Sequence, residues 1–274
     1  MLWVNRQLSH HIAATDRGLA YGDGVFATMR FNQHGPLFVD THLARLAQSC
    51  QRLSIDWQAS AELTDFLVKI CQQAYQDFGQ DGCLKVLLSR GSGGRGYQAP
   101  QVASLTEVVS IHPIPAHYAQ WQQQGINLSV SDFSLARQPR LAGMKHLNRL
   151  EQVLIRQQPL PQDCDDVVVC DTQGWVTETA IANLFIVTND RVYTPCLAHA
   201  GVAGVMRQQI ICTLAQQGYS VEATQIDRAR LLQAESVFIS NSLFGIIDIN
   251  RIDDKLYQRA SFTETLRSAL NLQL

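Results

Sequence analysis

Arg140-Leu-Ala-Gly-Met-Lys-His-Leu-Asn-Arg149 is the most informative stretch of this sequence, because it holds a lysine that no local pattern explains. Only four lysines occur among the 274 residues, against eighteen arginines. Arginine stays charged in proteins, whereas a lysine can be tuned to a free amine that forms a Schiff base. Each lysine of this chain is therefore a candidate for chemistry.

Lys145 differs from the other lysines in its surroundings. Gly143 precedes it and leucines follow at helical spacing, which places the lysine at or near a helix start, where the macrodipole opposes a cation. His146 and Arg149 add positive potential nearby. Both effects favour the neutral, nucleophilic amine over the ammonium. The alternative is an ordinary lysine that extends into solvent from the first turn of a helix.

The composition disfavours several classes of partner and site. A net charge of -2 and a pI near 6.4 argue against nucleic acid and anionic membranes as partners. The N-terminus has no signal-peptide pattern and no stretch approaches a membrane span, so we expect a cytoplasmic protein. Seven scattered cysteines without a Cys-x-x-Cys pair predict reduced, mostly buried thiols. A metal site is not expected, because ligand spacing is absent around His10, His11, His112 and His117.

Turn signals and hydrophobic periodicity predict two domains. The first part contains short strands, over residues 2–5, 25–31, 37–39, 84–89 and 106–112, and two amphipathic helices, over residues 41–53 and 61–74. Two prolines, Pro113 and Pro115, and a polar run of glutamines mark a linker. We therefore expect a small α+β domain over residues 1–115, a linker over residues 116–125 and a larger domain over residues 126–274.

The larger domain is predicted to be rich in strands. These are expected over residues 128–131, 167–170, 176–179, 183–187, 192–194, 237–240 and 245–249. An Asn189-Asp190 turn joins two of them in a hairpin. A helix from about Gly204 to Gln217 ends at Gly218, which is a standard C-terminal stop.

A glycine-rich segment, Gly91-Ser-Gly-Gly-Arg-Gly96, fits the dinucleotide-binding pattern G-x-G-x-x-G. The context argues against that function, because Tyr97-Gln-Ala-Pro100 and another strand follow in place of a helix. A loop that brings Arg90, Arg95 and Tyr97 over a cleft agrees better with the pattern, since a guanidinium can bind a carboxylate bidentately. The alternative is a mobile surface hairpin with solvated arginines.

The start of the helix near Gly204 is a second candidate anion site. Residues 198–217 contain no acid, and Arg207 lies in the first turn. Gly201 and Gly204 would let backbone amides approach a phosphate closely.

Glu178 lies in a stretch, residues 175–186, that is otherwise apolar or small. Its carboxylate must either face water at a strand edge or be paired inside the protein, for example by a protonated ring nitrogen. A lysine for an aldehyde, an acid for a pyridinium and an anion site for a phosphate together match pyridoxal 5'-phosphate.

Six motifs follow one another along nearly the whole chain: Asp16-Arg17 with Tyr21-Gly-Asp-Gly-Val-Phe26, His42-Leu-Ala-Arg-Leu46, Ser89-Arg-Gly-Ser-Gly-Gly-Arg-Gly-Tyr97, Leu141 to Gln152, Gly174-Trp-Val-Thr-Glu178 with Ala182-Asn-Leu-Phe185, and Gly201-Val-Ala-Gly-Val-Met-Arg207. In this order they resemble the fold type IV, class IV aminotransferase-like, pyridoxal-phosphate enzymes. The resemblance implies an α+β fold of two domains, with a small α+β N-terminal domain and a larger β-rich C-terminal domain. It also implies that the cofactor lies between them and that a homodimer completes the site.

The resemblance also assigns roles to individual residues. Lys145 is implied as the Schiff-base lysine and Glu178 as the partner of the pyridine nitrogen. The phosphate would be held by Arg45, by the amides of Val205 and Met206, and by Asn241 or Ser242 in a later loop.

Residues 145–152 and the glycine-rich loop are similar to a lyase of this family more than to its transaminases. The resemblance implies conversion of 4-amino-4-deoxychorismate to 4-aminobenzoate and pyruvate in folate biosynthesis, with Lys145 removing the proton from C4. The substrate carries two carboxylates, and we expect Arg95, with Arg30 and Tyr97 as further candidates, to bind at least one. The alternatives are a branched-chain or D-amino-acid transaminase on the same scaffold and a non-catalytic vitamer-binding module.

Overall fold

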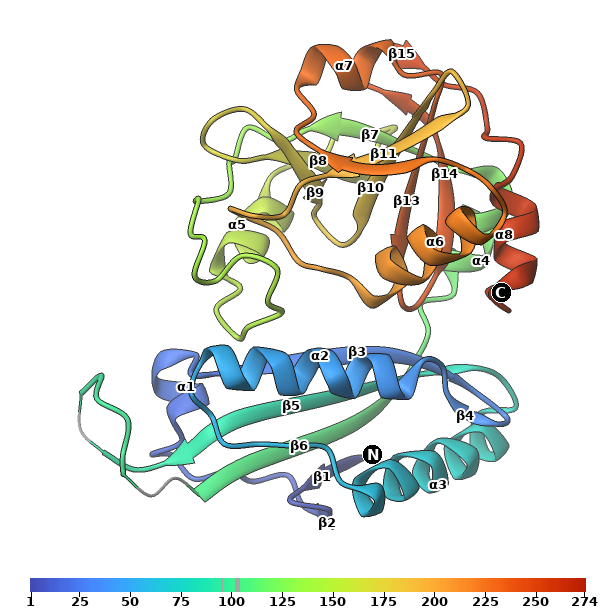
Figure 1. Cartoon of the computed structure of the whole chain (residues 1–274). Helices are drawn as coiled ribbons and strands as arrows, with labels where there is room; N and C mark the ends of the chain where they lie inside the picture. Colours follow the sequence, from blue (N-terminus) through green and yellow to red (C-terminus); the bar gives the residue numbers. More distant parts are fainter. Residues whose placement is uncertain (95, 102–103) are drawn as a thin grey trace. The chain divides into compact units, whose positions relative to one another are not determined.

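The structure is a computed structural model that describes residues 1–94, 96–101 and 104–274. Its contacts divide the chain into two compact units, which we propose as the domains of the protein. The first unit comprises Met1–Ile114 together with Lys145–Arg149, and the second comprises Pro115–Met144 together with Leu150–Leu274. Each unit contains one sheet and its own helices (Figure 1), so the predicted α+β class is confirmed.

The first unit is built on an antiparallel sheet of six strands in the order β2-β1-β6-β5-β3-β4. The strands are β1 (Leu2–Val4), β2 (Gln7–Leu8), β3 (Gly24–Asn32), β4 (Gly35–Pro36), β5 (Gly82–Ser92) and β6 (Ser104–Pro113). The helices are α1 (Arg17–Tyr21), α2 (Val39–Arg52) and α3 (Ala61–Phe78). The register pairs Gly24 with Ser89 and Arg30 with Cys83, so these two residue pairs lie at opposite ends of the β3–β5 ladder.

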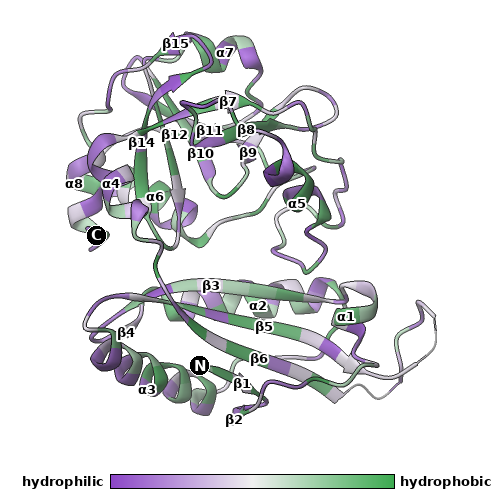
Figure 2. Cartoon of the chain, turned by 180° about the vertical axis from the view of Figure 1, so that it is seen from behind, coloured by the Kyte–Doolittle hydropathy of each residue, from purple (hydrophilic) through white to green (hydrophobic). Residues whose placement is uncertain are grey.

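The core of the first unit lies between the sheet and the two longer helices. Alternate residues of β3, from Val25 to Phe31, point into it, which is the period of a strand with one buried face. Helices α2 and α3 contribute Leu46 and Leu67 to the same cluster. Ser60 starts α3, because its hydroxyl accepts a hydrogen bond from the Leu63 amide. Figure 2 shows the hydrophobic colouring that runs along β3 and β5.

The second unit contains a nine-stranded sheet in the order β12-β11-β10-β13-β14-β7-β8-β9, with β15 paired to β14. Its strands are β7 (Ile126–Val130), β8 (Asp166–Cys170), β9 (Val176–Thr179), β10 (Asn183–Thr188), β11 (Arg191–Pro195), β12 (Val221–Thr224), β13 (Ser236–Asn241), β14 (Gly245–Ile252) and β15 (Lys255–Leu256). Its helices are α4 (His117–Gln124), α5 (Leu150–Gln157), α6 (Val205–Gln216), α7 (Arg228–Gln233) and α8 (Thr263–Ala269).

Two local signals in the second unit are confirmed. The Asn189-Asp190 turn joins β10 to β11, and both residues adopt positive φ angles of 50° and 59°, as a tight hairpin requires. Helix α6 begins after Gly204 and is followed by Gly218 at a φ of 86°. The Phe185 and Phe238 rings pack in the interior of this unit, where they stack with their centroids 4.7 Å apart.

The segment predicted as a linker, residues 116–125, instead contains helix α4. The reason is tertiary: the buried Gln122 side chain donates to the carbonyl oxygens of Phe244 and Leu272, both at 2.6 Å. The polar run of glutamines therefore belongs to the second unit.

Lys145 does not lie at a helix start, which corrects the sequence prediction. Helix α5 begins at Leu150, and the segment before it is extended along β3. Phe26 donates its amide to the Lys145 carbonyl at 2.9 Å, and Leu147 donates to the Gly24 carbonyl at 3.0 Å. These backbone bonds are incompatible with a helix at Lys145, so the macrodipole argument does not apply to this residue.

The cysteines are less uniformly buried than expected. All seven are free thiols; Cys50, Cys71 and Cys83 are buried, whereas Cys196 and Cys212 are exposed. Burial raises the pKa of Cys50 to about 11. Within the described ranges, no helix has the length and apolar character needed to cross a membrane.

Candidate functional site

The backbone around Lys145 is held firmly against β3. A Cβ atom at Gly24 would lie 2.2 Å from the Leu88 carbonyl oxygen and 2.8 Å from the Leu147 side chain, so only glycine allows this close approach. The Lys145 amine lies 4.7 Å from the centre of the Phe26 ring. The aromatic face and the fixed backbone together limit the positions that this amine can reach.

Cationic side chains gather around Lys145 within the first unit. Burial, the charge of Arg45 and the charge of Lys145 hold the pKa of His42 well below its usual value. Burial and the charge of Arg149 lower the pKa of Arg45 to about 10. Sequence analysis did not select His42, although it stands three residues before Arg45 on α2, which is helical spacing for a shared face. A cluster of this charge suits an anionic ligand.

Burial of His42 gives the stability of the protein a pH dependence. The folded protein keeps this imidazole neutral, whereas an unfolded chain binds a proton near pH 6.5. Because the unfolded state then binds more protons, the free energy of unfolding falls below about pH 6.5, by at most about 1.4 kcal/mol per pH unit for one histidine. We expect chemical denaturation at about pH 7.5 and about pH 5.5 to show this loss, and His42→Asn to show a smaller one. An unchanged pH dependence in His42→Asn would contradict the assignment.

Glu178 lies on β9 in the second unit and is 6% exposed. Its Oε2 atom accepts a hydrogen bond from the Val202 amide at 2.8 Å, which orients the carboxylate. Gly201, with a φ of 83°, makes this possible, because a Cβ atom there would lie 2.7 Å from the Thr177 side chain. The carboxylate is therefore internal and directed by the turn that begins at Gly201.

The same turn leads into helix α6. Asn183 donates its side-chain amide to the Val202 carbonyl at 2.8 Å, and its Oδ1 accepts from the Gly204 amide at 3.2 Å. The first turn of α6, which contains Val205 and Met206, has no acidic residue and no side-chain cap. First-turn amides have no partner inside a helix, and they attract anions. Residues 201–204 thus connect an oriented carboxylate to a candidate anion site.

Sequence analysis assigned no role to Asn183 or to Ser240. The two residues are directly paired between β10 and β13, so their side chains share one face of the sheet. Ser240 is 1% exposed, and its hydroxyl has no hydrogen-bond partner among the described residues. Because it is buried beside Asn183, Ser240 is a further candidate for the anion site. The alternation of side chains along β13 is the sequence signal that could have indicated it.

Asn241, a candidate phosphate ligand by the resemblance, takes part in the turn after β13. Its Oδ1 accepts from the amides of Leu243 and Phe244, at 2.9 and 3.0 Å, and closes the turn after β13. Ser242, the neighbouring candidate, is partly exposed in this turn. Arg207 also turns away from the start of α6, because its guanidinium donates to Thr194 and to the Pro195 carbonyl.

The structure does not bring the predicted substrate-binding residues together. Arg30 is 4% exposed, and its Nε donates to Asp81 at 2.7 Å. Arg30 is six residues along β3 from Gly24, which pairs with Ser89 at the end of the sheet where the glycine-rich loop leaves. Six strand residues span roughly 20 Å, so Arg30 lies far from that loop. Tyr97, by contrast, is 91% exposed in the glycine-rich loop. Arg95 lies outside the described residues.

Arg90 also differs from its prediction as a residue over a cleft. It is 8% exposed, and its guanidinium donates to both carboxylate oxygens of Asp23 and to the carbonyls of Leu53 and Ser54. This arginine is therefore structural.

Comparison with known proteins extends these observations. A model of the amino-transferase class IV family matches residues 24–252. An aminodeoxychorismate lyase of Vibrio harveyi is 36% identical over 261 residues, which are 92% of this chain and 91% of the relative. The crystal structure of a 4-amino-4-deoxychorismate lyase from Pseudomonas aeruginosa has a TM-score of 0.92 at 35% identity and covers 100% of both chains. A hypothetical aminotransferase from Mycobacterium tuberculosis, in its PLP-bound form, shares the fold with a TM-score of 0.85 at 20% identity, over 99% of this chain and 97% of that one.

Proposed function

The chain belongs to the amino-transferase class IV family, and from this membership we propose that it is a pyridoxal-phosphate-dependent lyase that converts 4-amino-4-deoxychorismate to 4-aminobenzoate and pyruvate. The membership confirms the resemblance and the fold type predicted from the sequence. The observation that carries the proposal is the turn at residues 201–204, which directs Glu178 and leads into the first turn of α6. The carboxylate of Glu178 suits the ring nitrogen of a phosphorylated pyridine, and the start of α6 suits its phosphate.

We assign the cofactor contacts residue by residue. The amides of Val205 and Met206 and the cation of Arg45 would hold the phosphate, and Glu178 would face the pyridine nitrogen. Lys145 would carry the aldehyde carbon. Gly143, whose backbone bonds to Gly201 and Ala203, precedes this lysine by two residues in the chain. Pyridoxal phosphate, when bound, supplies an electron sink for negative charge that develops on the substrate.

Lys145 is proposed as the base of the reaction. Its free amine removes the proton from C4 of the substrate ring, and loss of the enolpyruvyl group then makes the ring aromatic. The resulting ammonium can return a proton to the departing enolpyruvate, which gives pyruvate.

The proposal is tested by incubating the purified protein with pyridoxal phosphate and 4-amino-4-deoxychorismate and measuring both products. We expect 4-aminobenzoate and pyruvate in equal amounts without an added amino acceptor. Formation of pyridoxamine phosphate from D-alanine or a branched-chain amino acid, without 4-aminobenzoate, would identify a transaminase. Binding of the cofactor with no turnover of either substrate would identify a vitamer-binding module.

Gly204→Ala is expected to weaken cofactor binding. A Cβ atom at Gly204 would lie 2.1 Å from Asn183 Oδ1, so the turn must move and carry the first amides of α6 with it. Loss of one or two hydrogen bonds to a charged phosphate corresponds to a dissociation constant raised about 10- to 100-fold. Titration of the apoprotein with pyridoxal phosphate, followed by absorbance, measures it. Gly174→Ala is the control: its φ of 83° strains an alanine in the turn between β8 and β9, but a Cβ atom there meets nothing within 4 Å and the turn before α6 is left intact. An equal effect in both variants would contradict the assignment.

We also propose that the protein is a cytoplasmic homodimer. The support for self-association is an apolar stripe on α5, where Leu150, Val153 and Leu154 recur at helical spacing and are 76%, 47% and 47% exposed. Sedimentation of the purified protein at several concentrations measures the oligomeric state, and a monomer at all of them would contradict this proposal.

A further inference from the structure

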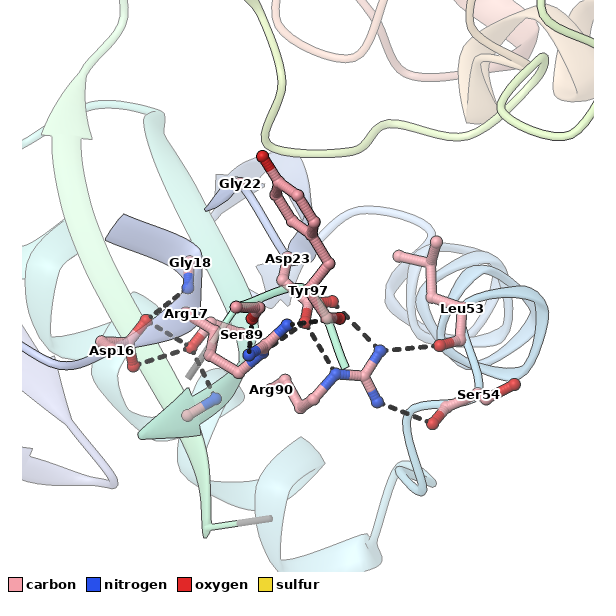
Figure 3. A network of polar contacts seen from close by, with 12 residues as sticks. Asp16, Arg17, Gly18, Gly22, Asp23, Leu53, Ser54, Ser89, Arg90 and Tyr97 are labelled. Carbon is pink, nitrogen blue, oxygen red and sulfur yellow. Dashed lines mark hydrogen bonds and ion pairs between the residues drawn. The ribbon is translucent and has the colours of Figure 1, made fainter. Parts of the chain in front are cut away.

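A buried network of charged residues lies at the end of the first unit's sheet from which the glycine-rich loop leaves (Figure 3). Asp23 is its centre, because the guanidinium groups of Arg17 and Arg90 both donate to this carboxylate, through Nε atoms at 2.9 and 2.7 Å. Burial acts to raise the pKa of Asp23, but the hydrogen bonds and charges of Arg90 and Arg17 outweigh it and lower the pKa. Asp23 therefore stays ionised and holds both arginines.

The N-terminal side of the glycine-rich loop is fixed by strand β5, which precedes it. Arg90, near the end of β5, donates to the carboxylate of Asp23 and to the carbonyl oxygens of Leu53 and Ser54, which follow α2. Ser89 donates to Asp16 at 2.8 Å and accepts from the Gly91 amide at 3.0 Å. The loop thus leaves the sheet from a rigid base.

The C-terminal side of the glycine-rich loop, at Gly96 and Tyr97, is held by Arg17. This residue is 3% exposed, and its two terminal nitrogens donate to the carbonyls of Gly96 and Tyr97, both at 3.1 Å. Figure 3 shows the Tyr97 ring pointing away from the network while its backbone faces Arg17. The Tyr97 ring also meets Tyr21 edge-on at 5.7 Å, and the Arg17 guanidinium lies 4.8 Å from the Tyr21 ring centre.

The backbone of the loop needs such an anchor. Its glycines at positions 91, 93, 94 and 96 have φ angles of 86°, 134°, 72° and 71°. Glycine has more conformational freedom to lose on ordering than any other residue, so contacts from outside the loop decide which conformation is populated. Arg17 supplies two charge-assisted hydrogen bonds from a side chain that is itself fixed by Asp23.

We propose that Arg17 is a positioning residue for the substrate: by holding the Gly96 and Tyr97 carbonyls, it keeps the Tyr97 ring where it can bind 4-amino-4-deoxychorismate. This inference rests on the proposed function, because it takes the loop to be part of the substrate site. It assigns to the Asp16-Arg17 motif a role that sequence analysis did not give it.

The test uses Arg17→Met and Arg17→Lys in the cofactor-loaded enzyme, with Arg6→Met as the matched control. Arg6 is an arginine of the same unit whose ion pair with Glu107 is partly exposed and does not involve the loop. Two quantities are measured: the rate of chymotrypsin cleavage after Tyr97, identified by fragment mass, and the separate values of KM and kcat for the substrate.

We expect both Arg17 variants to be cleaved after Tyr97 more than about tenfold faster and to have KM raised about tenfold, with kcat changed less than about threefold, since two hydrogen bonds to a charged group are lost. Lysine should not rescue, because its single ammonium cannot reach Asp23 and both carbonyls together. Unchanged cleavage would overturn the anchoring role. Faster cleavage with an unchanged KM would overturn the role in substrate positioning.

Gly96→Ala tests the proposal without disturbing the buried ion pairs. A Cβ atom at Gly96 meets nothing within 4 Å, but its φ of 71° disfavours alanine, so the carbonyl that Arg17 holds must shift. We expect faster cleavage and a raised KM in this variant too, and normal values would count against the proposal. If the unmodified enzyme makes no 4-aminobenzoate, the proposed function fails, whereas the cleavage rates still report on the anchor.

Discussion

Lys145→Ala is expected to abolish formation of 4-aminobenzoate, with kcat lowered at least about 10³-fold, because the substitution removes both the attachment of the cofactor and the base. In the unsubstituted protein, borohydride reduction should fix pyridoxal phosphate onto the peptide that contains Lys145. Mass spectrometry of the digested protein identifies the modified residue directly.

Lys85 provides the discriminating control. Its amine lies 5.0 Å from the centre of the Phe26 ring, nearly as close as the 4.7 Å of Lys145, but it belongs to strand β5. Lys85→Ala should therefore keep the borohydride label and most of the turnover. A label on Lys85, or undiminished product formation by Lys145→Ala, would refute the mechanism proposed above.

Glu178→Gln is expected to have the second-largest effect. The amide has the same shape, and its oxygen can still accept from the Val202 amide, so the turn at residues 201–204 should be preserved. The substitution removes the negative charge that would keep the pyridine nitrogen protonated. We expect kcat to fall about 10²- to 10³-fold, the range found when one preorganised electrostatic group is removed from an active site.

Two measurements separate this role from a structural one. Pyridoxal phosphate should still bind Glu178→Gln, with an altered absorption spectrum, and the thermal stability of the apoprotein should change little. Glu222→Gln is the matched control, because Glu222 is exposed on β12 in the same unit. Full turnover in Glu178→Gln would show that another group protonates the ring.

Much of the local structure follows from short-range chemistry. The glycines that flank α6 and the Asn189-Asp190 hairpin act within a few residues of their position, so the sequence alone predicts them. The six motifs identified the family for the same reason, since each is a contiguous run of residue types. Glu178 was also recognisable, because an acid among apolar residues is costly unless it is paired.

The missed features depend on residues far apart in the chain. The sequence predicts a linker where helix α4 lies, because the partners of Gln122 are 122 and 150 residues away in the chain. The extended backbone at Lys145 depends on bonds to Gly24 and Phe26, which overrode the helical spacing of the leucines that follow.

The sequence by itself determined the family of this chain, and its motifs are the basis on which a reactive lysine, an internal acid and an anion site are proposed. Only the tertiary structure decided which charged residue meets which. Arg17, Arg30 and Arg90 have the same guanidinium group in the sequence, but each is buried against a partner that folding brings to it, Asp23 or Asp81. The physical reason is that the energy of a buried charge depends on its neighbours and its distance from water, and folding sets both.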